Sequence, residues 1–188
     1  EIFAIIHQLS RSGTTVLLVE QNAARALSAS NTAYLLANGR IVESGKSEDL
    51  LAGKIVISMA NALVRVNKEF QPLVPPRGSV AAHVQAAVPN CRLVAAFHHL
   101  PAAELGHVDQ PIDSDVLICG DDPDAVSEVS EIVAKFPGCR PLDAGELSNA
   151  TAIEAFTAVL LQLNVRYKTR VAPKLTGIKI ESPAVDAG

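Results

Sequence analysis

The sequence has few aromatic residues and little net charge. Aromatic side chains make up 4% of the 188 residues and tryptophan is absent, so stacking platforms that bind single-stranded nucleic acid or sugars are poorly provided for. Sixteen basic residues against 20 acidic residues give a net charge of −4, which argues against electrostatic capture of a nucleic acid. We therefore expect no nucleic-acid partner and an aliphatic core.

Cysteines and long apolar runs are also scarce. The three cysteines, Cys91, Cys119 and Cys139, form no CxxC pair, which disfavours a disulfide framework or a zinc site. Mean hydropathy is +0.24, yet no stretch approaches the roughly 18 uninterrupted apolar residues that a membrane helix needs. We expect a protein of a reducing compartment, the cytoplasm, with no membrane insertion and no metal ligands.

The sequence also lacks a loop for nucleotide phosphates. No two of its 11 glycines are closer than six positions, which rules out the dinucleotide fingerprint GxGxxG. Gly45-Lys46-Ser47 resembles the end of a Walker A loop, but that motif needs a glycine five residues before Gly45, whereas Gly39 lies six before it. We therefore interpret this stretch as hairpin and turn.

The first 52 residues combine short helices and strands. Helical apolar spacing starts at residue 1, without an initiator methionine or a cap, so we expect a fragment or a junction product. Asn38-Gly39 between two short strands predicts a tight hairpin turn. The expected elements are a helix over 1–11, a strand over 15–20, a helix over 23–29, a hairpin of 33–36 with 40–43, and a short helix over 48–51 capped by Ser47.

After residue 53, apolar strands alternate with helices. Continuous apolar runs such as 116–119 (VLIC) are typical of a parallel sheet covered on both faces. One helix starts at Asp122-Pro123 and ends before Gly138. We predict an α/β fold with a mostly parallel sheet, flanking helices and a long C-terminal helix, from strands at 54–58, 92–97, 115–119 and 140–143 and helices at 79–88, 123–136 and about 149–168.

The C-terminal helix has more apolar surface than one packing contact can cover. Ile153, Phe156, Leu160 and Leu163 follow one another at spacings of three and four, and further apolar residues widen the stripe. Such a helix needs cover on more than one side. We therefore expect a homodimer that pairs through this helix.

Three segments of the first part of the chain occur together: 5–9 (IIHQL), 15–23 (TVLLVEQNA) and 33–45 (AYLLANGRIVESG). With them, this part resembles the C-terminal end of a branched-chain amino-acid ABC transporter ATPase. The resemblance implies that Gln21 stands where this family has a switch residue facing the γ-phosphate, while the Walker motifs would lie upstream of Glu1. Without those motifs, we interpret Gln21 as a strand end that caps the next helix.

Six segments of the second part occur together in one order: 53–63 (GKIVISMANAL), 94–103 (VAAFHHLPAA), 115–122 (DVLICGDD), 142–145 (LDAG), 154–160 (EAFTAVL) and 164–168 (NVRYK). With them, the second part resembles NADPH-dependent reductases of the deazaflavin coenzyme F-420. The resemblance spans about residues 53–178 and implies a partial Rossmann-like sheet, without the half that carries the family's glycine loop. It also implies subunits that pair through C-terminal helices.

The resemblance also implies a cofactor site. In this family hydride passes directly between the nicotinamide ring and the deazaflavin ring, so no catalytic acid, nucleophile or metal is assigned. His98 is expected to be a polar contact of the deazaflavin, Leu100 and Ala102 its apolar walls, and Leu161 of the last helix the opposite wall. Asn61 is expected where the nicotinamide approaches. Open α/β sheets bind ligands at the C-terminal ends of strands, which agrees with this placement.

Other polar residues have simpler interpretations. We interpret His99 as structural. Asp122-Pro123 is a sufficient helix start, so Asp121 and Asp122 are not assigned to a metal. A basic run near the C-terminus is interpreted as a solvated face, with a contact to the anionic deazaflavin tail as the alternative; it comprises Arg166, Lys168, Arg170, Lys174 and Lys179.

Together these features predict a chimera of two parts. Residues 1–52 form an ABC ATPase fragment, and residues 53–188 form the C-terminal portion of a deazaflavin-dependent NADP reductase. The function assigned is hydride transfer between NADP(H) and coenzyme F-420, impaired because the NADP phosphate loop is absent from the sequence. The alternatives are an ATP-binding subunit fragment of an amino-acid ABC transporter and a non-catalytic chimeric fold.

Overall fold

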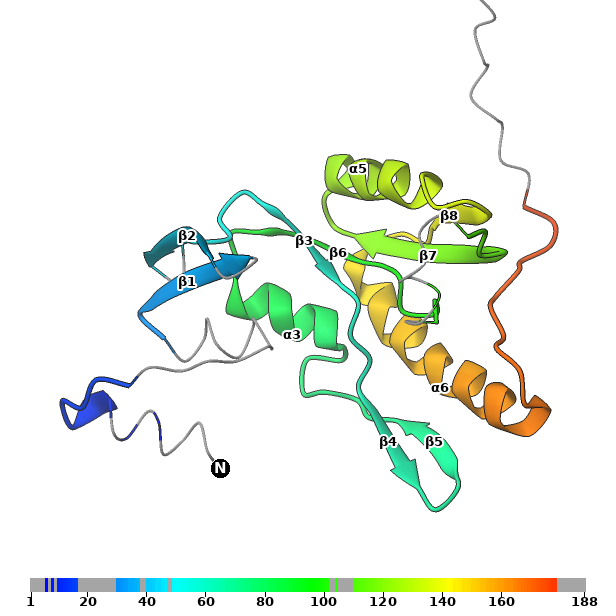
Figure 1. The fold of residues 1–188 in the computed structure, drawn as a ribbon, viewed down its shortest axis with the longest axis horizontal. Helices are drawn as coiled ribbons and strands as arrows, with labels where there is room; N and C mark the ends of the chain where they lie inside the picture. Colours follow the sequence, from blue (N-terminus) through cyan, green and yellow to red (C-terminus); the bar gives the residue numbers. More distant parts are fainter. Residues whose placement is uncertain are drawn as a thin grey trace, which may run out of the picture.

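A computed structural model describes residues 6, 8, 10–16, 30–37, 40–46, 49–101, 104 and 110–178. Figure 1 shows how the helices and strands are arranged. In chain order they are β1 (Thr32–Ala37), β2 (Arg40–Lys46), β3 (Ile55–Ser58), β4 (Leu63–Val66), β5 (Glu69–Pro72), α3 (Val80–Ala87), β6 (Arg92–Ala95), β7 (Ser114–Gly120), α5 (Pro123–Ala134), β8 (Cys139–Asp143), the 3-10 helix η1 (Leu147–Asn149) and α6 (Ala150–Tyr167).

The central sheet has the strand order β3-β6-β7-β8. β3 runs parallel to β6, and β7 runs parallel to β8. β6 and β7 are antiparallel and meet only where both strands end, through Val94 opposite Gly120 and Ala95 opposite Cys119. The predicted α/β fold is confirmed, but the antiparallel step was not foreseen, because an apolar run buried on both faces reads alike in either direction.

Helices cover both faces of this sheet (Figure 1). Neighbouring residues of β6 point to opposite faces, as the pleat requires. Val94 faces α5, in a cluster with Val116, Ile118, Val126, Val129 and Val133. Leu93 and Ala95 face α3 and α6, in a cluster with Ala81, Val88, Cys119 and Ile153.

Two helix starts follow the expected capping chemistry. The Ser79 hydroxyl oxygen accepts from the Ala82 N–H at 2.9 Å, and the Asp122 carboxylate accepts from the Ala125 N–H at 2.9 Å. Each cap satisfies a backbone donor that the first helical turn leaves free. Asp122 thus has the predicted role.

The apolar surface of α6 is partly used within the chain itself. Ile153 and Leu160, two residues of the predicted apolar stripe, are only 5% and 6% exposed within the single chain. Ile153 belongs to the cluster on the α3 side of the sheet, with Leu93 and Ala95. Phe156 and Val159 remain exposed on this helix, so its surface for a partner is narrower than the sequence suggested.

A hairpin of β4 and β5 was not predicted, since no element was expected between the strand at 54–58 and the helix at 79–88. The strands pair antiparallel through a two-residue turn, with Val66 opposite Glu69. Asn67 occupies this turn with φ of 57°, a left-handed conformation that asparagine tolerates better than most residues. The Phe70 N–H donates to the side chain of Gln162 at 3.3 Å, which attaches the hairpin to α6.

The N-terminal part contributes the hairpin of β1 and β2. These strands pair antiparallel with an irregularity between Leu35 and Leu36, which confirms the predicted hairpin, while Asn38-Gly39 lies outside the described residues. Ala33 and Leu50 pack against the cluster on the α3 side of the sheet. This hairpin therefore shares a core with the part that follows.

Three other N-terminal predictions have different outcomes. Residues 49–51 form a turn, with the Leu50 N–H donating to the Lys46 carbonyl at 3.0 Å, so the short helix over 48–51 was wrong; four residues gain too few hydrogen bonds to offset helix nucleation. Residues 6, 8, 10 and 11 are helical, as expected for 1–11. Most of the strand over 15–20, the helix over 23–29 and Gln21 lie outside the described residues.

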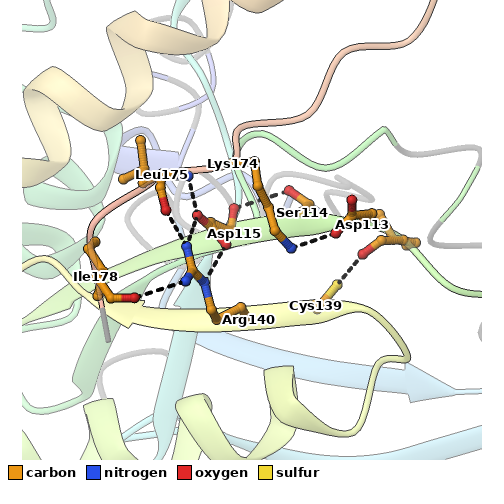
Figure 2. Close-up of polar contacts among 9 residues, drawn as sticks. Asp113, Ser114, Asp115, Cys139, Arg140, Lys174, Leu175 and Ile178 are labelled. Atoms are coloured by element: carbon orange, nitrogen blue, oxygen red, sulfur yellow. Dashed lines mark hydrogen bonds and ion pairs between the residues drawn. The ribbon is translucent and has the colours of Figure 1, made fainter. Parts of the chain in front are cut away.

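After α6 the chain returns along β7 as a C-terminal strap, residues 171–178 (Figure 2). The carboxylate of Asp115 accepts from Arg140 Nε at 2.7 Å, from Arg140 Nη2 at 2.6 Å and from the Leu175 N–H. The Asp115 N–H donates to the Pro173 carbonyl at 2.8 Å. A fully buried carboxylate thus joins β7, β8 and the strap.

Cysteine chemistry agrees with the expectation from composition. Cys91, Cys119 and Cys139 are all free thiols. Burial raises the pKa of Cys119 to about 11, so this thiol is protonated and unreactive at neutral pH. Within the described ranges, no helix is long and apolar enough to cross a membrane.

Candidate functional site

The candidate site lies where β3 and β6 end side by side. The ladder between them continues one step beyond β6, because the Ala96 N–H donates to the Ser58 carbonyl at 3.1 Å. The chain then makes a tight turn over 97–100, in which the Leu100 N–H donates to the Phe97 carbonyl at 3.3 Å. His98 and His99 occupy the two central positions of this turn.

Six buried polar atoms at this place have no hydrogen-bond partner. His98 is 4% exposed and His99 is 5% exposed, and neither ring nitrogen of either side chain is bonded. Ser58 Oγ and Asn61 Oδ1 are unpaired as well. Buried polar groups are nearly always paired, since an unpaired one costs stability. All such side-chain atoms found among the described residues belong to this one site.

The turn is attached through its backbone instead. The His98 carbonyl accepts from Asn61 Nδ2 and from Thr157 Oγ1, each at 3.3 Å. Because a carbonyl can only accept, the amide nitrogen of Asn61 must face it, which leaves Oδ1 of the same amide as an unpaired acceptor. The His99 ring meets Phe156 of α6 edge-on, with 5.6 Å between centroids.

Burial keeps both imidazoles neutral. It lowers the pKa of His98 to about 4, with repulsion from His99 as a smaller cause. Burial likewise lowers the pKa of His99 to about 4. At neutral pH each ring therefore offers one N–H donor and one bare nitrogen acceptor, and the site carries no formal charge of its own.

The structure brings together some of the residues that the sequence analysis singled out. Asn61 bonds to the backbone of His98, and Leu100 ends the same turn. Leu100 is buried in the cluster on the α5 side of the sheet. Leu161 is half-buried on α6. Ala102 lies outside the described residues.

Three residues of the site were not assigned by the sequence analysis. His99 was interpreted as structural, yet it has the same burial and the same unpaired nitrogens as His98. Ser58 is the last residue of β3, and Thr157 stands four residues after Ile153 and three before Leu160 on the buried stripe of α6. A hydroxyl on an otherwise apolar stripe is the signal that could have identified Thr157.

Other buried or acidic groups have structural partners. Glu154 accepts from the N–H groups of Val80 and Ala81 at 2.8 and 3.0 Å, and so holds the start of α3. Asp121 accepts from the Leu147 N–H at 2.9 Å. No cluster of three metal-ligating side chains occurs among the residues that the structure describes.

Two members of the basic run are paired with acids. Arg170 contacts Glu104 at 3.6 Å, and Lys174 contacts Asp113. Three of these residues, Glu104, Asp113 and Arg170, line a cavity of about 400 Å³. Two of them are acidic and one is basic, so the lining described has no surplus positive charge for an anionic tail.

Comparisons with known proteins point in two directions. No family profile matches the chain. Over 132 residues the chain is 39% identical to the F420-dependent NADP reductase of Methanocaldococcus jannaschii, a match that covers 69% of this chain and 57% of the relative. The chain is also similar to the high-affinity branched-chain amino acid transport ATP-binding protein BraG of Pseudomonas aeruginosa, with 62% identity over 42 residues. This shorter match covers 22% of this chain and 18% of the relative.

A solved structure has a similar fold. The chain resembles, with a TM-score of 0.56 and 23% identity, the crystal structure of an Arthrobacter protein assigned as an F420-dependent NADP-reductase. That match covers 65% of this chain and 57% of the other, so the chain spans little more than half the length of these two reductases. Over 69% of its length, the chain is homologous to F420-dependent NADP reductase.

Proposed function

We propose that this chain carries the deazaflavin side of an oxidoreductase that moves hydride between NADP(H) and coenzyme F-420. The observation that carries the proposal is the group of six buried, unpaired polar atoms of Ser58, Asn61, His98 and His99. Unpaired polar atoms lower the stability of the fold, and a ligand that hydrogen-bonds to them would explain why they are retained. The homology supports the ligand class, since the relative is an F420-dependent NADP reductase.

The donors and acceptors of the site fit the edge of a ring with alternating carbonyl and N–H groups. The neutral imidazoles supply both kinds of group, Asn61 Oδ1 accepts, and the Ser58 hydroxyl can do either. Leu100 and Ala102 provide apolar walls in this proposal, and Leu161 closes the opposite side. Asn61 also marks the side from which the nicotinamide approaches.

The protein's task in such a reaction is to position the two cofactor rings and to exclude water from them. Bound deazaflavin supplies the carbon that gives or takes the hydride. The uncharged site around His98 and His99 offers no proton donor of low pKa and keeps bulk water away from the rings. Because the ring nitrogens are covered in this structure, the site must open for the ligand to reach them.

We further propose that these 188 residues bind deazaflavin without binding NADP tightly. Pyrophosphate affinity in dinucleotide folds depends on a glycine loop at a helix N-terminus, and the sequence has no GxGxxG motif. In this proposal residues 1–52 come from an ABC transporter ATPase and residues 53–188 from the reductase, in accord with two matches to unrelated relatives. Three free thiols fit a reducing compartment such as the cytoplasm.

The proposed assembly is a homodimer through α6. Phe156, Val159 and Tyr167 lie at spacings that share one face of the helix and are 36%, 51% and 68% exposed. A face with this much exposed apolar area gains free energy when a second copy covers it. His99 packs on Phe156 from within, so the dimer face borders the site.

One sample tests the function against its alternatives. Coenzyme F-420 fluorescence should change saturably on titration with the chain, whereas NADPH and ATP should show no saturable change at micromolar concentrations. Saturable NADPH binding would contradict the missing phosphate site, and ATP binding would favour the transporter fragment. A folded chain that binds none of the three ligands would leave the non-catalytic fold as the answer.

A further inference from the structure

The turn that carries the two histidines is held in a strained conformation. Phe97 has φ of 63°, in the left-handed region that bulky residues rarely adopt. Its ring is nearly buried and meets Phe136 edge-on, with 5.7 Å between centroids. Such backbone persists only where surrounding contacts over-determine it. The contacts that do so identify the residues on which the site depends.

Two side chains from separate elements hold the carbonyl that follows this strained residue. Asn61 lies 37 residues before His98 in the chain, and Thr157 lies 59 residues after it. Their hydrogen bonds join the end of β3, the turn and α6 at a single oxygen atom. The imidazole of His98 takes no part in this attachment, and its two ring nitrogens are unpaired among the described residues, so they can bind a ligand once the site opens.

We propose that Asn61 and Thr157 are positioning residues, which clamp the His98 carbonyl from two sides and thereby keep both imidazoles in place for the ligand. If either donor is lost, Phe97 can relax toward negative φ, and the peptide plane after it rotates. The rings then move toward solvent. The identity of the ligand in this inference rests on the proposed function, whereas the role of the two hydrogen bonds in holding the turn does not.

The clamp has a consequence that can be measured without any ligand. Burial is the main cause that holds the pKa of both histidines at about 4. A turn that relaxes lets water reach the rings, which lessens the penalty on the charged form and raises these pKa values. A merely structural threonine on α6 would not change the titration of a histidine in another segment.

The test compares variants of Thr157 in the full chain. Thr157→Val removes the donor and keeps the branched shape, whereas Thr157→Ser restores the donor. Thr151→Val is the matched control, because Thr151 lies on the same helix beside Gly78 and Ser148, away from the turn. Imidazole titrations by NMR are recorded without ligand, and binding of coenzyme F-420 is followed by fluorescence.

Thr157→Val should raise the pKa of His98 by about one unit and weaken coenzyme F-420 binding about tenfold. Thr157→Ser and Thr151→Val should behave like the native chain. Asn61→Ala, in a loop, should give the same pKa shift and serves if Thr157→Val does not fold. Unchanged titration of both histidines in a folded variant would overturn the clamp. If the pKa shifts but the native chain binds no coenzyme F-420, the clamp stands and the proposed function fails.

Discussion

Two groups of buried polar side chains, one on the sheet and one in the turn that follows β6, are satisfied to opposite degrees. Asp115 on β7 is fully buried, and both of its carboxylate oxygens accept hydrogen bonds from Arg140. His98 and His99 are nearly as buried, yet none of their ring nitrogens has a partner. A satisfied group stabilises the fold, whereas an unsatisfied one lowers its stability and is retained where function requires it.

The pKa shifts of the two groups reflect the same difference in hydrogen bonding. The pKa of Asp115 is lowered chiefly because Arg140 donates to its charged form. The pKa values of His98 and His99 are lowered because burial penalises their charged form. A shift in the same direction thus reports a partner in the first case and the lack of one in the second.

The largest expected effect is a loss of stability in mild acid. The unfolded chain takes up one proton on each histidine as the pH falls below about 6.5, while the folded chain takes up none until about 4. Stability present above pH 6.5 is therefore lost on the way to pH 4, by about 2 kcal/mol per histidine between pH 7 and pH 5. Urea unfolding at both pH values measures the loss.

The control for this prediction replaces both rings with apolar side chains. His98→Leu combined with His99→Leu should remove the loss between pH 7 and pH 5, since nothing in the turn then titrates. The contribution of Asp115 lies in a separate window, because a depressed carboxyl pKa matters only below its ordinary value of 3.8. An equal loss with and without the histidines would contradict the assignment.

The next effect is the removal of the satisfied group. Asp115→Ala should lower the free energy of unfolding by about 3 kcal/mol, since it removes the carboxylate that accepts from Arg140 and from the Leu175 N–H and loosens the C-terminal strap. The matched control is Asp113→Ala, whose side chain is 83% exposed in its contact with Lys174; its loss should stay below about 1 kcal/mol. Similar losses in the two variants would refute a special role for Asp115.

A smaller effect separates binding from folding in the unsatisfied group. His98→Ala should weaken coenzyme F-420 binding by about 1–2 kcal/mol, the usual value of one hydrogen bond to a neutral partner. A fluorescence titration of the native and variant chains gives the difference. Unchanged affinity would show His98 to be an ordinary turn residue.

The smallest effect on stability is expected at the proposed dimer face. Val159→Asp should change the free energy of unfolding of the subunit by no more than about 0.5 kcal/mol, because the side chain is 51% exposed. It should nevertheless shift a dimer to a monomer in sedimentation. Val165→Asp is the control, being 49% exposed but about 120° away around the helix. A native chain that sediments as a monomer would end the dimer proposal.

The elements that local chemistry specifies were predicted closely. The structure has α3 at Val80–Ala87, α5 at Pro123–Ala134 and α6 at Ala150–Tyr167, each within two residues of its predicted ends. The strand starting at Arg92 was predicted two residues too long, because Phe97 turns out of the sheet with a positive φ. The candidate site begins where the chain leaves the sheet, so the least accurate of these predicted boundaries is the one that bears on function.

The candidate site itself was only partly predictable. The resemblance to a reductase family singled out His98, and the structure adds His99. The residues next to His99 in the sequence gave no sign that it is more than a loop residue. Asn61 and Thr157 donate to one carbonyl, that of His98, although they lie 37 residues before it and 59 residues after it. No local pattern reports such a meeting, because it depends on how α6 packs across the sheet.

By itself the sequence determined the aliphatic core, the capped helices and the apolar strands, since these depend on periodicity and on residues within one helical turn of each other. Only the tertiary structure decided the direction of β7 against β6, the partners of Asp115 and the isolation of His98 and His99. The physical reason is that satisfaction of a buried polar atom depends on neighbours brought together across long stretches of chain. Arg140 lies 25 residues from Asp115, and Leu175 lies 60, whereas among the described residues no polar group pairs with the ring nitrogens of the two imidazoles.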